Sequence, residues 1–179
     1  MKRAFTLIEL LVVVAIIAIL AGIALPNFLE AQTRSKVARV KADQRTVATA
    51  LEAYRVDENR YPSSTLISPF RRLRPLTTPV AYLTDLPQDI FANSNAPGPF
   101  QTRGNFNYGA MPIDKESRYA LTSVGPDRGA NNDGIEFYPG YSEDLWENPT
   151  SSFNFIRYDP TNGTISVGDI WRLSDRQPN

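Results

Sequence analysis

The sequence predicts an α+β protein in which one long N-terminal helix packs on a small antiparallel sheet. An uninterrupted apolar run extends from Leu10 to Leu25. The following stretch, residues 27–59, contains no glycine or proline, and its apolar residues recur at intervals of three and four, as on one face of a helix. Short runs of β-branched and aromatic residues come later in the chain, separated by turn residues, and these runs predict strands.

The composition limits the size of the protein and excludes several functions. A chain of 179 residues has room for one helix and one small globular domain. Its 19 Lys and Arg residues balance its 19 Asp and Glu residues, so it lacks the basic excess of a nucleic-acid-binding protein, and we expect no nucleic-acid partner. Cysteine and histidine are absent, which excludes disulfides, thiolate or imidazole metal sites and a Ser-His-Asp triad. No other catalytic pattern stands out, so we predict that the protein is not an enzyme.

Residues 5–25 are predicted to form the first part of the helix and to cross a membrane. With a rise of ~1.5 Å per residue, this segment is about 31 Å long, which matches the hydrocarbon thickness of a bilayer. Lys2 and Arg3 precede the segment, so the positive-inside rule places the N-terminus in the cytoplasm. Every residue after Pro26 then lies on the other side of the membrane.

Glu9 is the strongly polar side chain of this segment, and three interpretations of it compete. A cleaved secretory signal has a shorter apolar core, of about 7–15 residues, and has no need of a carboxylate. A plain single-span anchor leaves Glu9 unexplained, although a charged side chain at the centre of a membrane helix costs about 2.5–3.5 kcal/mol, and less near an end. In the third interpretation the chain is cut just before Phe5, so that the free amine of a neighbouring copy pairs with Glu9.

The run from Ala4 to Val13, Ala-Phe-Thr-Leu-Ile-Glu-Leu-Leu-Val-Val, resembles the class III signal of type IV prepilins and type II secretion pseudopilins. The resemblance implies that a prepilin peptidase cuts between Ala4 and Phe5, removes residues 1–4 as a leader peptide and methylates the new N-terminal amine of Phe5. Ala4 stands where the family usually has glycine. Glu9 matches the family's glutamate, which neutralises the N-terminal amine of the adjacent subunit during assembly.

The same resemblance implies a pilin-like fold and a structural role in a helical filament. The main expectation is a type II secretion major pseudopilin that acts in protein export. Its implied partners are further copies of the chain, the prepilin peptidase, an inner-membrane assembly platform, minor pilins or pseudopilins, and membrane lipid. The chain is then a single-pass inner-membrane protein, and its C-terminal domain is periplasmic or extracellular in a filament.

Two alternative functions stay open at this point. One is a type IV pilin of a surface fibre that acts in adhesion, motility or DNA uptake. The absence of a cysteine pair favours the pseudopilin. The C-terminal segment, residues 158–173, is longer than expected for a compact major pseudopilin, and this length leaves the pilin open as an alternative. The other alternative is a single-pass, membrane-anchored binding module that stays uncut and monomeric.

Residues 26–59 are predicted to continue the helix beyond the membrane as an amphipathic half. One narrow apolar stripe consists of Val37, Val40, Val47, Leu51 and Tyr54. Gln44 occupies the position between Val40 and Val47 at which the spacing of this stripe calls for an apolar residue. Gly22 and Pro26 interrupt the helical pattern upstream. Because proline lacks an N–H group and clashes with the carbonyl four residues back, Pro26 is expected either to kink the helix or to mark the membrane exit.

Residues 60–179 are predicted to form the globular domain. The helix should end at Arg60-Tyr61-Pro62, because the residue before a proline avoids helical angles. A proline-rich loop with a short helix at 67–73 follows. Strands are predicted at 106–111 and 119–124, and at 153–158 and 164–167 on either side of the Asn162-Gly163 turn.

The segment from Gly125 to Gly134 is rich in oxygen donors and admits two interpretations. Asn, Asp and Gly are the usual residues of turns, so composition alone favours an ordinary loop. Calcium also prefers carboxylate and carbonyl oxygens in a flexible loop. The segment resembles the calcium loop that follows a strand in major pseudopilins, and this resemblance implies a calcium site at Asp127, Asn131 and Asp133.

Overall fold

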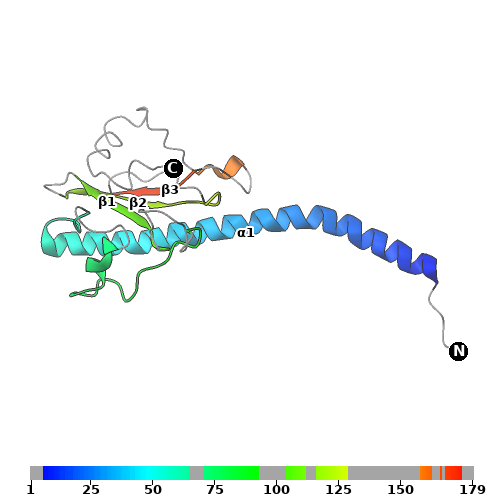
Figure 1. Ribbon diagram of the computed structural model, residues 1–179, viewed down its shortest axis with the longest axis horizontal. Coiled ribbons are helices and arrows are strands. Elements are labelled where there is room, and N and C mark those ends of the chain that lie inside the picture. The colour runs from blue at the N-terminus through cyan, green and yellow to red at the C-terminus, as the bar shows by residue number, and fades with distance from the viewer. Residues whose placement is uncertain are drawn as a thin grey trace.

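The computed structural model of the protein describes residues 6–64, 71–92, 104–111, 116–128, 158–162, 166 and 168–174. In this part of the chain the elements are helix α1 (Leu7–Glu58), 3-10 helix η2 (Arg74–Leu76), strands β1 (Asn107–Met111) and β2 (Arg118–Ser123), 3-10 helix η4 (Pro160–Asn162) and strand β3 (Ile170–Leu173). The strands form one antiparallel sheet in the order β1-β2-β3, which lies along one side of α1 (Figure 1). The predicted α+β fold class is confirmed.

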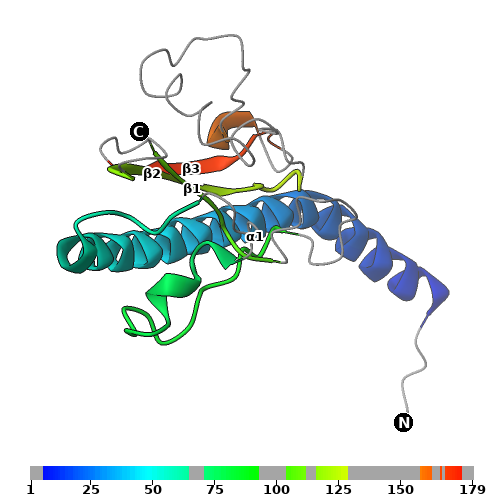
Figure 2. The ribbon, with the colours of Figure 1, turned by 60° about the vertical axis from the view of Figure 1, so that its left-hand side comes forward.

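Local sequence signals set both ends of α1. Thr6 is the N-cap residue, and Asn59 is the C-cap residue, with a φ of 57°. Asparagine tolerates this left-handed conformation better than most residues do. Pro62 follows closely and prevents the helix from continuing, and the helix ends at Glu58, just before the end that the sequence predicts at Arg60-Tyr61-Pro62. The N-terminal part of α1 projects beyond the rest of the molecule and bends away from the direction of the C-terminal part (Figures 1 and 2).

The C-terminal half of α1 buries one stripe in the core. Its buried residues are Val37, Val40, Gln44, Val47, Ala48, Ala50 and Leu51. The same core contains residues of all three strands, namely Tyr108, Ala110, Tyr119, Leu121 and Ile170. Full burial of a valine or leucine side chain stabilises a fold by about 1.5–3 kcal/mol, so this stripe holds the helix on the sheet. The predicted stripe is confirmed, with Tyr54 at its margin, where its ring meets the ring of Tyr82 edge-on at 5.6 Å between centroids.

Gln44 is the polar member of the buried stripe, and the structure shows why a polar residue fits there. Its side chain is only 2% exposed. The Nε2 atom donates a hydrogen bond of 2.8 Å to the backbone oxygen of Ile170 in β3. Burying an amide without a partner would cost free energy, and this bond removes that cost while it ties the helix to β3.

The strands agree only in part with the sequence analysis. The strands predicted at 106–111 and 119–124 are confirmed as β1 and β2, which pair with Gly109 opposite Ala120. Strand β3 was not predicted, because a run of four residues is too short to show a strand pattern. Residues 65–70, 153–157, 163–165 and 167 lie outside the described part of the chain, so the predicted short helix and final hairpin are not tested. Residues 71–73 and Ser166, which are described, belong to no α-helix or strand.

The turn that follows β2 fits closely against the chain that leads into β3. Gly125 has a φ of +72°, and the N–H of Arg128 donates to its oxygen at 3.1 Å. A Cβ atom on Gly125 would lie 2.2 Å from the backbone oxygen of Gly168. Asp127 Oδ2 accepts a hydrogen bond from the N–H of Gly168 at 3.3 Å. Glycine is therefore required at position 125 both by its conformation and by the close approach of Gly168.

We predict that Gly125→Ala destabilises the globular domain by more than about 2 kcal/mol. The left-handed conformation alone costs a residue with a Cβ about 1–2 kcal/mol, and the clash with the Gly168 backbone adds to this cost. The free energy of unfolding would be measured by urea denaturation of the full chain in detergent. Gly104→Ala is the matched control, because Gly104 has a φ of +84° but has nothing within 4 Å of an added Cβ. Equal losses in the two variants would contradict the predicted clash.

Candidate functional site

The first half of α1 presents a continuous apolar surface. Large apolar side chains between Leu7 and Leu29 are 47–83% exposed. By length and composition this part of α1 is able to cross a membrane, as a signal sequence near an N-terminus also is. The core helix of a soluble protein can be equally long and apolar but is mostly buried, whereas none of this apolar stretch is buried within the described structure. Apolar surface on this scale marks contact with a membrane or with another protein.

Glu9 lies one turn into this apolar helix, and its carboxylate folds back onto the helix start. Glu9 Oε2 accepts hydrogen bonds from the backbone N–H of Thr6 at 2.9 Å and from the Thr6 hydroxyl at 2.7 Å. The Thr6 Oγ1 atom in turn accepts a bond from the N–H of Glu9 at 3.3 Å. This reciprocal arrangement is a capping box, which satisfies two donors at the start of the helix.

The capping box explains how a single copy of the chain carries an acid in an apolar segment. The carboxylate has two local donors, both contributed by the residue three positions earlier. These donors are neutral, so the negative charge of Glu9 is solvated but not neutralised. This role of Thr6 was not predicted, although a threonine three residues before a glutamate is the usual sign of a capping box. Ala4 and Phe5, the predicted cleavage site, lie outside the described residues.

Gly22 and Pro26 both lie inside α1, which continues through them without a break. No atom lies within 4 Å of the place where a Cβ on Gly22 would stand, so one face of the helix is open at this position. A proline in a helix removes one backbone hydrogen bond and favours a bend. The figures show a bend in the projecting part of α1 (Figures 1 and 2).

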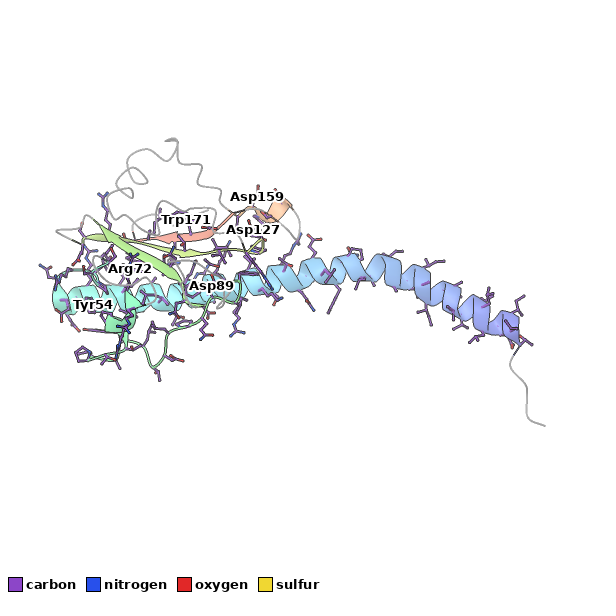
Figure 3. The ribbon with its side chains drawn as sticks, in the orientation of Figure 1. Tyr54, Arg72, Asp89, Asp127, Asp159 and Trp171 are labelled. Carbon is purple, nitrogen blue, oxygen red and sulfur yellow. The ribbon has the colours of Figure 1, made fainter. Side chains whose placement is uncertain are left out.

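Of the three residues predicted to bind calcium, the structure describes only Asp127. It lies at the end of the sheet that faces the projecting part of α1 (Figure 3). Its carboxylate accepts the bond from Gly168 described above. Asn131 and Asp133 lie outside the described part of the chain. Within the described ranges, no three His, Cys, Asp or Glu residues gather in a way that could hold a metal ion.

A buried acid that the sequence analysis missed, Asp89, holds the start of the same turn. It is 4% exposed, and its two carboxylate oxygens accept the N–H groups of Phe91 at 3.0 Å and Val124 at 3.2 Å. Burial raises the pKa of Asp89 above its ordinary value of 3.8, and bonds from Phe91, Ser123 and Val124 oppose this rise. In the sequence, Asp89 is recognisable only as a common turn residue, because aspartate side chains in turns often accept the backbone N–H of the residue two positions later.

The raised pKa of Asp89 has a defined consequence for stability. The folded state binds this proton more tightly than the unfolded state, so protonated Asp89 contributes stability at pH values below its unfolded pKa. That contribution is lost as the pH rises through the higher folded pKa. The hydrogen bonds that the Asp89 side chain accepts from the N–H groups of Phe91 and Val124 fix the end of β2.

Comparison with known proteins agrees with these observations. Residues 1–25 match a family described as the prokaryotic N-terminal methylation motif. The type II secretion system core protein G of Pseudomonas aeruginosa is 32% identical over 142 residues, which cover 74% of this chain and 91% of that protein. The core protein G of Dickeya chrysanthemi is 28% identical over 145 residues, or 93% of its length.

A pilin gives a shorter match. The type IV major pilin protein PilA of Myxococcus xanthus is 49% identical over 60 residues, which cover 34% of this chain and only 27% of that pilin. No solved structure matches the chain significantly. The similarity to core protein G extends over most of both proteins and therefore includes the globular domain as well as the helix. The chain belongs to the pilin-like family of the type II secretion system core protein G.

Proposed function

We propose that the protein is a non-enzymatic subunit of a helical filament, the major pseudopilin of a type II secretion system that acts in protein export. One observation carries this proposal. A single helix is packed on a sheet along its second half, while its first half is bare, apolar and led by a capped acid. Such a helix is suited first to a membrane and then to a bundle of identical helices, because both environments cover the same apolar surface.

The unassembled subunit is then a single-pass inner-membrane protein with a cytoplasmic N-terminus. The basic residues Lys2 and Arg3 set this orientation, which places the globular domain in the periplasm. A prepilin peptidase removes residues 1–4 and methylates Phe5. An inner-membrane platform and minor pseudopilins are the further partners of assembly.

Glu9 has a different partner in each of the two states. In the lone subunit its carboxylate is held by the backbone and hydroxyl of Thr6. Once the chain is cut, the amine of Phe5 on a neighbouring copy supplies the positive charge that Thr6 lacks. A charge pair is stronger in an apolar surrounding than in water, so this exchange favours assembly over the isolated state. Contacts of this head-to-tail kind do not close, and they generate an open filament.

The type IV pilin remains a second candidate function because of the 49% identity with PilA over 60 residues. Electron microscopy of the producing cells distinguishes the two. Abundant long surface fibres that contain this chain would favour the pilin, whereas their absence alongside a loss of protein export in a deletion strain would favour the pseudopilin.

The mass of the native protein tests the proposed processing. We expect a mature chain that lacks Met1 to Ala4 and begins with a monomethylated Phe5, because the peptidase performs both steps. Intact-mass measurement and N-terminal peptide sequencing of protein purified from its membrane would show this directly. A chain that keeps Met1 and occurs only as a monomer would instead identify a membrane-anchored binding module.

Substitution of Glu9 tests the assembly mechanism. Glu9→Gln keeps a residue able to form the capping box but removes the charge, whereas Glu9→Ala removes both. We expect both variants to insert in the membrane and both to lose filament yield by about tenfold or more, since breaking a buried charge pair costs about 3–5 kcal/mol. Yield would be measured as sheared or sedimented filament relative to total subunit. Near-normal yield from Glu9→Gln would show that the capping box, and not the charge, is what assembly requires.

We also propose that the loop after β2 binds calcium through Asp127, Asn131 and Asp133. The chemistry of Asp127 supports this proposal, because calcium prefers carboxylate oxygens on a flexible loop. Its position at a close contact between the β2 turn and Gly168 means that a bound ion would brace the same contact. The ion would supply charge and rigidity there, and it would take no part in a reaction.

Calorimetry tests the calcium site. Titration of the full chain in detergent with calcium should release or absorb heat at one site and should raise the melting temperature of the domain. Asp127→Asn should reduce both effects, whereas Asp85→Asn, an exposed acid in the loop before β1, should leave them unchanged. Absence of heat together with an unchanged melting temperature in the wild type would contradict the site.

A further inference from the structure

A band of basic side chains follows the exposed apolar surface of α1. The large apolar side chains of that surface end at Leu29, which is 50% exposed. The next turns of the helix carry five exposed basic residues, Arg34, Lys36, Arg39, Lys41 and Arg45, which we call the basic band. Val37 and Val40 lie among them in the sequence but are buried against the sheet. The basic band therefore occupies the exposed sides of the helix where it leaves its apolar half.

The basic band carries more positive charge than its acidic neighbours balance. Arg34 forms an ion pair with Glu30, and the Nε atom of Arg39 lies 3.7 Å from Asp43 Oδ2. Among the described residues, no ion pair involves the other three members, Lys36, Lys41 and Arg45. Between positions 30 and 45 the chain has five basic and two acidic residues, which leaves a net charge of +3.

The turn after β2 adds a basic side chain at the end of the domain nearest the apolar half of α1. Figure 3 shows Asp127 of this turn, together with Asp159, at the end of the sheet that faces the projecting part of α1. Both acids are held within the domain, Asp127 by the N–H of Gly168 at 3.3 Å and Asp159 by the N–H of Thr161 at 2.8 Å. Arg128 follows Asp127, is exposed, and takes part in no ion pair within the described ranges.

Tyr158 shows that this end of the domain lies beside the start of the basic band. Burial raises the pKa of Tyr158, the charge of Arg34 opposes the rise, and the charge of Glu30 adds to it. These electrostatic interactions place the segment that leads into η4 close to the first turn after the apolar surface. Tyrosine is also one of the residues that are enriched at membrane–water interfaces.

A membrane around the apolar half of α1 would bring the start of the basic band to the bilayer surface. With a rise of ~1.5 Å per residue, Arg34 and Lys36 lie about 8 and 11 Å beyond Leu29, and Arg45 lies about 24 Å beyond it. The headgroup layer on each side of a bilayer is about 5–7 Å thick. Long basic side chains can extend back toward it. Arg34 and Lys36 therefore reach the headgroups, whereas Arg45 does not.

We propose that Arg34, Lys36 and Arg128 bind the phosphates of anionic phospholipids in the leaflet from which the globular domain projects. This inference rests on the single-pass orientation given under the proposed function. Basic residues beside a membrane anchor attract anionic headgroups. The leader contains Lys2 and Arg3, so its removal leaves the basic band as the main positive flank of the apolar segment. The lipid contact holds the domain close to the bilayer surface before assembly.

The test is the affinity of the unassembled full chain for single added lipids, measured by native mass spectrometry in a neutral detergent. Phosphatidylglycerol and phosphatidylcholine with the same acyl chains are the probes, because they differ in headgroup charge. All chains carry Lys2→Gln and Arg3→Gln, which remove the basic side chains at the other end of the apolar segment. Lys36→Gln with Arg128→Asn is the test variant, since asparagine tolerates the φ of 58° at position 128. Arg45→Gln is the matched control, an exposed basic residue of the same helix that lies too far from the headgroups.

We expect the parent chain to bind phosphatidylglycerol more tightly than phosphatidylcholine. The test variant should weaken phosphatidylglycerol binding by about fivefold or more, which is the effect of roughly one basic residue at a membrane surface. Arg45→Gln should change this affinity by less than about twofold, because charges are screened over about 8 Å at physiological salt. Binding of phosphatidylcholine should be the same in all three chains. A higher concentration of ammonium acetate should reduce the preference for the anionic lipid.

Two results would overturn the proposal. One is equal affinity of the parent chain for the two lipids. The other is an equal loss in the test variant and in Arg45→Gln, which would indicate attraction by overall charge instead of a site at the membrane surface. Lys36→Gln alone is the second variant if the double variant fails to fold. The measurement uses single, uncut chains, so it does not depend on cleavage or filament formation, and the lipid site and the proposed filament fail separately.

Discussion

The packing of one narrow stripe of α1 on the sheet is the contact on which the rest of the structure depends. The described strands have five, six and four residues, and a small sheet of this kind needs an apolar face that packs against another element. The helix supplies the missing apolar surface, and the bond from Gln44 to Ile170 brings in the strand that is most distant in the sequence. Because the second half of α1 is fixed in this way, the first half is held out from the domain as an extension of a rigid element. A membrane anchor or an assembly rod requires this rigidity.

The contrast between the packed second half of α1 and its exposed first half explains how the polar groups of the helix are bonded. In the docked half, the polar residue of the stripe finds a backbone partner in the sheet. In the bare half, Glu9 accepts its hydrogen bonds, among the described residues, from the backbone N–H and the hydroxyl of Thr6 at the helix start. Neutral donors solvate a carboxylate but leave its charge in place. In the assembly proposed above, this charge is what a positively charged partner on a neighbouring copy would pair with.

The sequence allowed the helix, its buried stripe and two strands to be predicted, because each of these is a periodic pattern within one short segment. It did not allow β3, Asp89, Ser64 or Arg72 to be recognised. Each of these residues acquires its role from a partner that lies far away in the chain. Asp89 accepts the N–H of Val124, 35 positions later, and Ser64 bonds to Ala110, 46 positions later. In the candidate site, the glutamate was predicted from its chemistry, whereas its capping partner Thr6 was overlooked although the signal was local.

Contacts between copies of a chain through a sheet and through a helix have opposite consequences for assembly. Pairing of two identical strand edges would be isologous, since each copy would present the same surface to the other, and the result would be a closed dimer. Packing of one bare helix against a different face of the next helix is heterologous and continues without limit. A chain that must form a filament gains from keeping the first kind of contact unavailable. In the described residues, Ser64 and Arg72 bond to the backbone of Ala110 and Tyr108 in β1, whereas the first half of α1 is exposed, so in the proposed filament the helix is the surface through which copies would add.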